Sequence, residues 1–318
     1  GIGTMGQSAR DFVDFLKKAG QKYWQILPVC PTSFGDSPYQ SFSTFAGNPY
    51  FIDLDDLRAE GLLELSEYFD IDWESEPGTV NFSTLYEKRY PILRLAFKRF
   101  LDKKSDEFNK FCEEQSWWLD DYAMFMTIKN ANNGMSWLEW DDGVKSRNPL
   151  ALQTVENQYK DEINFWKVSQ YFFFKQWKLL REYANDNGVS IIGDLPIYVA
   201  LDSADVWAHK ELFELDEDFK QVNVAGVPPD AFSADGQLWG NPLYNWNVME
   251  ERGFDWWKQR MASNSKLYDF IRIDHFIGVV RYYSIPANSD TAKVGEWRPG
   301  PGKKLTDAID SAIGDASI

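Results

Sequence analysis

The stretch Val189-Ser190-Ile191-Ile192-Gly193-Asp194-Leu195-Pro196 decides the fold of this 318-residue chain. It is a short, largely apolar run that directly follows a long helical pattern from about residue 161 to residue 183. The pair Asn187-Gly188 closes that helix, because glycine readily adopts the backbone conformation that follows a helix end. A short apolar run placed after a helix is typical of a buried strand in a parallel sheet. The stretch therefore predicts a helix-then-strand unit that ends in a polar loop.

The same order of a helix followed by a short strand occurs twice more. An amphipathic pattern over Ser8 to Lys18 ends at Gly20 and leads into Tyr23 to Val29, which we interpret as a buried parallel strand. A third helix, around Trp256 to Met261, leads into Tyr268 to Asp274. Alternation of this kind predicts an α/β fold with a parallel sheet. Because long polar insertions follow the strands, a (β/α)8 TIM barrel fits better than a doubly wound sheet, and the barrel is incomplete in this chain because eight strands cannot be counted.

The region between the first two units has a different character. It is charged and rich in tryptophan, with helical patterns over Ile92 to Phe108 and Trp117 to Asn130 and no clear strand pattern. We expect an inserted, mainly helical subdomain here. The expected division is a barrel part with an active-site loop at 1–56, the helical subdomain at 57–150, and a second barrel part at 151–318 that contains the nucleophile strand and a covering loop at about 208–250.

Charge excludes several classes of partner. The chain has 33 basic and 49 acidic residues and a net charge of −16, which repels nucleic-acid backbones and anionic membrane surfaces. No stretch reaches the roughly 20 apolar residues that cross a bilayer. We therefore expect neither nucleic acid nor a membrane as a partner.

The counts of cysteine and histidine narrow the chemistry. Cys30 and Cys112 are too few for a disulfide framework, which indicates a reducing cytoplasm. His209 and His275 leave no room for a paired-histidine zinc motif. Because the chain also lacks a glycine-rich phosphate loop and a clustered metal-ligand motif, we expect no metal and no organic cofactor. Carboxylates are the most promising reactive groups.

Polar clusters follow each of the three predicted strands. They are Gly35-Asp36-Ser37-Pro38-Tyr39-Gln40, Gly193-Asp194-Leu195-Pro196 and Arg272-Ile273-Asp274-His275. In a parallel barrel the reactive groups lie at the carboxyl ends of the strands, so these clusters are the first candidates for a site.

Arg272 and Asp274 are two residues apart on a predicted strand, so their side chains share one face and can touch. A nearby guanidinium favours the ionised carboxylate and fixes its orientation, which is what a nucleophile requires. A structural ion pair is the alternative, and the spacing alone slightly favours it because charged pairs on strands are not rare. The residues themselves leave both interpretations open.

Five motifs in this order resemble the signature set of one family. They are Gly35–Gln40, Gly193–Val199 with Asp202–Trp207, Gly226–Asp230, Gly236–Pro242 and Arg272–Phe276. Together they are similar to those of the amylomaltase family, glycoside hydrolase family 77. The resemblance runs from Gly1 to about Leu305, which is nearly the whole chain.

The resemblance implies roles for the residues at the second and third clusters. Asp274 would attack the anomeric carbon and form a covalent glycosyl-enzyme, and Arg272 would orient its carboxylate. Asp194 would face the sugar-binding cleft, and His275, beside the nucleophile, would contact substrate.

The resemblance also implies a donor side and an acceptor side. Ser37 and Tyr39 would line the donor side, Gln237 and Trp239 would meet the acceptor sugar, and Asp230 would help to fix the covering loop. Sugar rings present apolar faces that stack on aromatic side chains, so Tyr39 and Trp239 near strand ends are suitable platforms.

Most of the 14 tryptophans are better explained by core packing. Trp24, Trp166 and Trp177 belong to this group, because they lie within predicted strands or helix faces.

Two departures from the family pattern are visible. The family commonly carries a hydroxylated aromatic residue where this chain has Phe34, so a hydrogen bond at a secondary glucan site there would be lost. The family's general acid/base is a glutamate in an Ala-Glu-Asp-Leu-Gly segment, which we expect immediately after Ile318. The resemblance thus implies a chain truncated at both ends.

The implied activity is that of a 4-α-glucanotransferase. It would transfer α-1,4-glucan segments between maltooligosaccharides or starch-derived dextrins by a retaining double displacement. An α-amylase-type hydrolase and a non-catalytic glucan-binding protein are the alternatives. Without its acid/base residue, the 318-residue chain alone is expected to be inactive.

Overall fold

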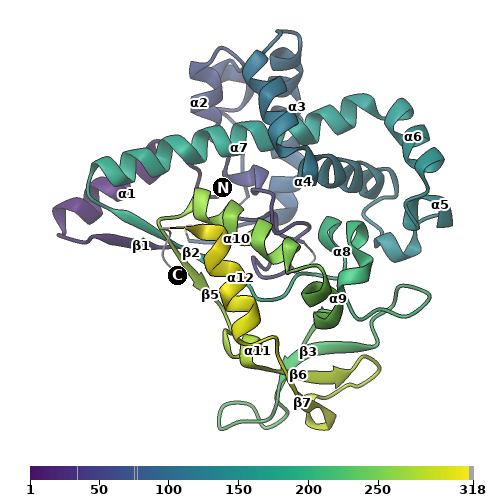
Figure 1. The fold of residues 1–318 in the computed structure, drawn as a ribbon. Coiled ribbons are helices and arrows are strands. Elements are labelled where there is room, and N and C mark those ends of the chain that lie inside the picture. Colours follow the sequence, from purple (N-terminus) through teal and green to yellow (C-terminus); the bar gives the residue numbers. More distant parts are fainter. Residues whose placement is uncertain (34, 75, 77, 315–318) are drawn as a thin grey trace.

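A long central helix organises the molecule. The computed structural model describes the chain except residues 34, 75, 77 and 315–318. Helix α7 (Lys160–Asp186) crosses between a group of helices on one side and a parallel sheet on the other (Figure 1). Phe172 and Phe173 in the middle of α7 are fully buried, so this helix contributes to the core on both sides.

The three predicted helix-then-strand units are present. The order of the parallel sheet in the described residues is β1 (Tyr23–Gln25), β2 (Ser190–Leu195) and β5 (Phe270–Ile273). Helices α1 (Gln7–Lys18), α7 and α10 (Asp255–Leu267) precede these strands. A sheet whose parallel strands each follow a helix is the arrangement of a (β/α)8 barrel segment. The barrel is incomplete, because β1 and β5 each pair only with β2 in the described part of the chain.

The two faces of this sheet differ in chemistry. Ile191, Leu195 and Ile271 are buried on the helix-covered face. The register places Asp194 directly opposite Arg272, and both side chains belong to the other face. The sheet therefore presents a charged pair on its uncovered side.

The first strand differs from its prediction. We expected a buried strand over Tyr23 to Val29, but β1 ends at Gln25 and the side chain of Tyr23 is 56% exposed. The prediction of burial was wrong for Tyr23, because β1 lies at a free edge of the sheet in the described residues, whereas Val29, beyond the end of β1, is buried.

The helices before α7 are α2 (Leu54–Ala59), α3 (Phe82–Leu101), α4 (Asp106–Ala131), α5 (Asp142–Lys145) and α6 (Pro149–Gln158). The predicted helix from Ile92 to Phe108 was wrong at its end, because Phe108 belongs to α4. The side chain of Ser105 accepts a hydrogen bond from the backbone N–H of Phe108 and so caps a new helix.

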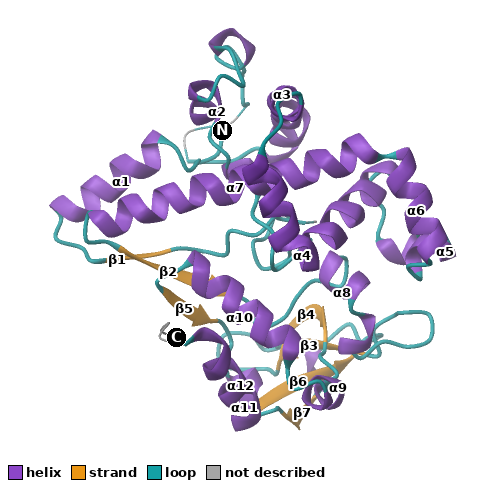
Figure 2. Cartoon of the chain, turned by 45° about the horizontal axis from the view of Figure 1, so that its top comes forward, coloured by secondary structure: helices purple, strands orange, loops and turns teal. Residues whose placement is uncertain are grey.

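A second, antiparallel sheet was not predicted. It consists of β3 (Asn223–Val227), β4 (Gln237–Pro242), β6 (Arg281–Pro286) and β7 (Glu296–Pro299), in the order β4-β3-β6-β7 (Figure 2). Two of its strands lie in the segment 208–250 that we expected as a loop, so that segment is partly built from strands. The remaining short helices are α8 (Ala204–Ala208), α9 (Trp246–Glu251), α11 (Ile277–Val280) and α12 (Lys303–Ile313).

The prediction that tryptophans pack in the core is confirmed for Trp166 and Trp177. Trp166 and Trp177 are 2% and 5% exposed and lie on α7. Trp24 is half-buried on β1 and packs edge-on against the ring of Phe12, which belongs to α1.

Candidate functional site

One arginine joins two carboxylates at the ends of the parallel strands. Nη1 of Arg272 donates to Oδ1 of Asp194 over 2.8 Å, and Nη2 donates to Oδ1 of Asp274 over 2.7 Å. The strand register places Arg272 opposite Asp194, and the backbone N–H of Asp274 donates to the carbonyl of Leu195. The negative charge of Asp194 and, to a smaller extent, that of Asp274 raise the pKa of Arg272 above its usual value, so the guanidinium stays charged.

The two carboxylates differ in exposure. The side chain of Asp194 is 1% exposed, whereas that of Asp274 is 38% exposed. Arg272 thus holds one buried and one accessible carboxylate. An ion pair is present, and it leaves Asp274 open to a molecule in the cleft.

Tyr39 completes the buried end of this network. Its hydroxyl donates to Oδ2 of Asp194 over 2.6 Å. Burial, together with this hydrogen bond, raises the pKa of Tyr39 to about 12, so the hydroxyl remains a donor. A turn around Ser37, in which the N–H of Tyr39 donates to the Ser37 hydroxyl, directs the tyrosine toward the sheet.

The antiparallel sheet supplies the opposite wall of the site. Gln237 and Trp239 are two apart on β4 and share a face, and Nε1 of Trp239 donates to Oε1 of Gln237 over 2.9 Å. The indole of Trp239 meets the ring of His275 edge-on, with ring centres 4.8 Å apart and an interplanar angle of 85°. This contact connects β4 to the segment that follows β5.

His275 has an unusual backbone and an unpaired nitrogen. Its φ is +51°, in the left-handed region that non-glycine residues seldom adopt. Nε2 is buried and has no hydrogen-bond partner among the described residues. Burial lowers the pKa of the imidazole, which therefore favours its neutral form.

Most of the predicted residues line one cavity. It has a volume of about 370 Å³ and is bounded by Ser37, Tyr39, Gln40, Pro196, Ile197, Tyr198, Gln237, Trp239, Asn241, Asp274 and His275. A concave site with aromatic walls and a few converging polar groups is typical of small-molecule binding. Asp194 and Arg272 lie behind this lining and contact it through Tyr39 and Asp274.

Asp230 lies outside the cavity lining, in an exposed turn. Its Oδ1 accepts hydrogen bonds from the N–H groups of Phe232 and Ser233, over 2.8 and 2.7 Å. The carboxylate therefore shapes the turn that connects β3 with β4.

The sequence did not point to five residues of the cavity lining, which are Gln40, Pro196, Ile197, Tyr198 and Asn241. Gln40 donates to Asn241 over 3.3 Å, and Asn241 donates to the carbonyl of Val199, so the two amides connect the walls. Tyr198 also lines the cavity. Each lies inside one of the five motifs, which is the signal that could have found them. Phe34 lies outside the described residues.

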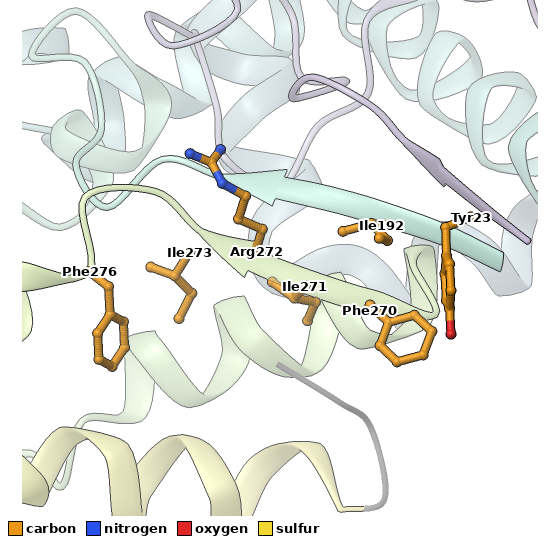
Figure 3. Close-up of a pocket in the computed structure, with 7 residues that line it drawn as sticks. All are labelled: Tyr23, Ile192, Phe270, Ile271, Arg272, Ile273 and Phe276. Carbon is orange, nitrogen blue, oxygen red and sulfur yellow. The ribbon is translucent and has the colours of Figure 1, made fainter.

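A second hollow, formed by side chains of β1, β2, β5 and the residue Phe276, is apolar. It has a volume of about 600 Å³ and is lined by Tyr23, Ile192, Phe270, Ile271, Arg272, Ile273 and Phe276 (Figure 3). The rings of Tyr23 and Phe270 lie side by side, and the guanidinium of Arg272 points away from these side chains. Asp274 does not line it, so the reactive groups belong to the other cavity.

Among the described residues, no group of three or more histidine, cysteine, aspartate or glutamate side chains has the arrangement to hold a metal ion. In the same part of the chain, no helix has the length and apolar character to cross a membrane.

The chain is similar to proteins of known function. The family model described as 4-alpha-glucanotransferase, glycoside hydrolase family 77, matches residues 1–318. The 4-alpha-glucanotransferase of Clostridium butyricum is 47% identical over 319 residues, which cover 100% of this chain and 66% of the relative. That of Streptococcus pneumoniae is 48% identical over 320 residues, which cover 100% of this chain and 63% of the relative. The chain thus spans a little less than two thirds of the length of these relatives.

Solved structures agree with the fold. An amylomaltase from Streptococcus agalactiae, in complex with acarbose, matches with a TM-score of 0.96 and 47% identity, over 100% of this chain and 65% of that one. An amylomaltase from Corynebacterium glutamicum matches with a TM-score of 0.79 over 98% of this chain and 43% of that one. At 19% identity, this second match concerns the fold alone.

Proposed function

The chain belongs to the 4-alpha-glucanotransferase family, glycoside hydrolase family 77, and on this premise we propose that the protein transfers α-1,4-glucan segments between maltooligosaccharides. The observation that carries the proposal is Asp274, which is open to a cavity lined by aromatic and amide side chains while Arg272 holds its carboxylate. The similar amylomaltase holds acarbose, which supports an oligosaccharide ligand for this cavity.

The reaction proceeds in two displacements. In the first, an oxygen of Asp274 forms a bond to C1 of the donor sugar while the glycosidic C1–O bond breaks and the leaving oxygen takes up a proton. In the second, the 4-hydroxyl of another glucan attacks C1, loses its proton and releases Asp274. Arg272, itself fixed by Asp194 and through it by Tyr39, holds the Asp274 side chain in the orientation for attack.

The acceptor side distinguishes transfer from hydrolysis. Trp239 offers an aromatic face for the acceptor ring, and the amide of Gln237 offers hydrogen-bonding groups beside it. His275 lines the same cavity and meets the indole of Trp239 edge-on. Holding the acceptor hydroxyl near C1 raises its effective concentration relative to water. The turn at Asp230 supports the covering segment that closes over this side.

A second carboxyl group must protonate the leaving oxygen from about 5 to 5.5 Å away. Asp194 is unsuited to this role, because it is buried and already accepts hydrogen bonds from Tyr39 and Arg272. We therefore place the general acid/base on a glutamate outside these 318 residues, as the family resemblance implies.

Incubation with maltotriose tests the proposed function. The protein expressed from its complete reading frame is expected to produce a ladder of shorter and longer oligosaccharides. Products that are only shorter than maltotriose would show hydrolysis and contradict the proposal. Binding without any turnover would point to the non-catalytic alternative.

We place residues 57–150 in a helical subdomain inserted into the barrel, with the barrel parts at 1–56 and 151–318. The two cysteines are free thiols, which supports a cytoplasmic location.

A further inference from the structure

A buried arginine behind the cavity has no part in the reaction as described so far. Arg260 lies on α10 and is 1% exposed. Its guanidinium lies near the rings of Trp256 and Trp257, with 5.4 and 4.9 Å between the guanidinium carbon and the ring centres. Burying a charge destabilises the folded state unless the charged group is hydrogen-bonded, and Arg260 has such partners.

The partners of Arg260 come from three separate segments. Nε donates to the hydroxyl of Thr44 over 2.8 Å. Nη1 donates to the carbonyl of Ile197 over 3.1 Å and to the hydroxyl of Tyr244 over 3.4 Å, and Nη2 donates to the carbonyl of Pro196. Pro196 and Ile197 directly follow β2, the strand that carries Asp194. One side chain thus connects this segment to the loop that carries Tyr39.

Asp205 holds the same loop from the other side. Its Oδ2 accepts from the N–H of Thr44 over 2.7 Å, and its Oδ1 accepts from the hydroxyl of Ser43 over 3.3 Å. Burial raises the pKa of Asp205 to about 7, while the Thr44 amide and the charge of Arg260 oppose that rise. Thr44 is therefore fixed between an arginine and an aspartate.

These contacts lie directly behind the reacting groups. A cavity of about 20 Å³ is bounded by Tyr39, Thr44, Pro196, Asp205 and Arg260 among other residues, so Tyr39 and the buried pair face the same small space. We propose that Arg260 is a positioning residue: by joining the Tyr39 loop to the carbonyl groups after β2, it sets the Tyr39–Asp194 hydrogen bond behind the nucleophile. The consequence for the reaction rests on the proposed function.

The planar guanidinium is what this role requires. Lysine keeps the charge but lacks the fork of N–H groups that serves Thr44, Pro196, Ile197 and Tyr244 together. Arg260→Lys is therefore expected to loosen the Tyr39 loop without removing the buried charge.

Kinetics of the protein expressed from its complete reading frame provide the first test. We expect Arg260→Lys to lower kcat for maltotriose about tenfold, with a smaller change in KM. Tyr39→Phe removes the hydrogen bond to Asp194, so in that background Arg260→Lys should lower kcat less than about threefold. Equal losses in both backgrounds would overturn the inference, because Arg260 would then act independently of Tyr39.

Hydrogen exchange of the same variants provides a second test that needs no activity. Arg260→Lys should increase amide exchange in residues 37–46 and 196–200. Arg89→Lys is the matched control, since Arg89 is also buried and donates to a backbone carbonyl, that of Ile52, from α3. The control should change stability but neither kcat nor exchange at 37–46.

The two tests separate the inference from the proposed function. If the wild-type protein makes no transfer products, the proposed function fails, yet faster exchange at 37–46 would still support the positioning role. Unchanged exchange there would overturn the inference even in an active enzyme. If Arg260→Lys does not fold, Thr44→Val removes the acceptor of Nε at similar volume, and the same outcomes apply to it.

Discussion

The two hydrogen bonds that Arg272 donates have different functions. The bond to buried Asp194 fixes the guanidinium, and the bond to exposed Asp274 then fixes the carboxylate that faces the cavity. Because Asp194 also accepts from Tyr39, the exposed carboxylate is supported through Arg272 by a buried carboxylate that does not itself line the cavity. This arrangement separates the reactive group from the groups that hold it.

Asp274→Asn should abolish transfer while leaving the fold intact. The amide is isosteric but cannot form the glycosyl-enzyme, so kcat for maltotriose should fall roughly 10⁴-fold. Thermal unfolding should change little, because Asp274 is partly exposed and Arg272 keeps its bond to Asp194.

Asp269→Asn is the matched control for this change. Asp269 also pairs with an arginine, Arg181, at the opposite end of β5. It should lower stability without a comparable loss of kcat. If Asp274→Asn lowers kcat less than about tenfold, Asp274 is only a member of a structural ion pair and not the nucleophile.

Trp239→Ala should shift the products from transfer toward hydrolysis. Without the indole the acceptor sugar loses its platform, so water competes better for the glycosyl-enzyme. The ratio of products longer than maltotriose to newly formed reducing ends measures this shift, because hydrolysis adds a reducing end and transfer does not. Trp239→Phe keeps an aromatic face and loses only the bond to Gln237, so its ratio should lie between those of the wild type and the alanine variant. An unchanged ratio in Trp239→Ala would argue against an acceptor role.

At the scale of elements, α7 holds the segment after the Tyr39 loop by its side-chain amides. Gln170 accepts from the N–H of Gly47 over 2.7 Å and donates to the carbonyl of the same residue over 3.0 Å. Gln176 makes the same pair of bonds to Asp53. Gly47 has no room for a side chain, because an added Cβ would lie 2.0 Å from the ring of Phe173.

Gln170→Leu should be strongly destabilising. It leaves two buried backbone groups of Gly47 without partners, which costs about 2–4 kcal/mol in the free energy of unfolding. Denaturant unfolding measures this difference. Gln158→Leu, at an exposed position at the end of α6, should change the same quantity by less than about 0.5 kcal/mol. Similar effects in both variants would contradict the role of the buried amide.

The parallel units could be predicted because each repeats one local pattern. Residues 189–195 and 268–274 are apolar runs after a helix end, and hydrophobic pattern and turn chemistry agree there. The boundary between α3 and α4 was misplaced because helical patterns continue across the polar Ser105 cap. The antiparallel sheet escaped prediction because β4 is mostly exposed and contains Gly240, so it lacks the apolar signal of a strand.

The part of the site that depends on local sequence patterns could be predicted. The spacing of Arg272 and Asp274 is local, and the motifs supplied most of the residues that the cavity brings together. The contact of Arg272 with Asp194 joins residues 78 apart in sequence, and that of Tyr39 with Asp194 joins residues 155 apart. Such pairings depend on strand register and loop closure, which spacing alone does not specify. Arg260 was missed because nothing in its local sequence separates a buried arginine from an exposed one.

At the scale of the whole molecule, buried tyrosines make stability sensitive to alkaline pH. Burial raises the pKa of Tyr39, Tyr50 and Tyr171 from 10.0 to about 12. Each keeps its proton more tightly when folded, so its contribution is present below pH 10 and is lost as pH rises from about 10 to about 12. The melting temperature should therefore fall steeply in this window, together with the appearance of tyrosinate absorbance. Tyrosinate formation that is half complete at pH 10 in the folded protein would contradict this.

The parallel sheet exposes apolar side chains beside β5, and few carboxylates lie near the reactive cavity. Strand β5 borders an apolar hollow, where Tyr23 is 56% and Phe276 is 45% exposed. In the described residues Asp274 is the one carboxylate that lines the reactive cavity. We therefore expect the 318-residue polypeptide on its own to give no measurable transfer, because no second carboxylate lines this cavity in the described residues to protonate the leaving oxygen.

Assay of the purified 318-residue polypeptide with maltotriose, alongside its circular dichroism and the binding of a hydrophobic dye, checks this expectation. Helical content should match the structure, and a hydrophobic dye should bind, because the hollow beside β5 exposes apolar side chains. Quenching of tryptophan fluorescence by maltotriose should persist, since Trp239 and Tyr39 already line the cavity. Turnover at a rate similar to that of the complete protein would instead place the general acid among these residues and refute its assignment to a glutamate outside them.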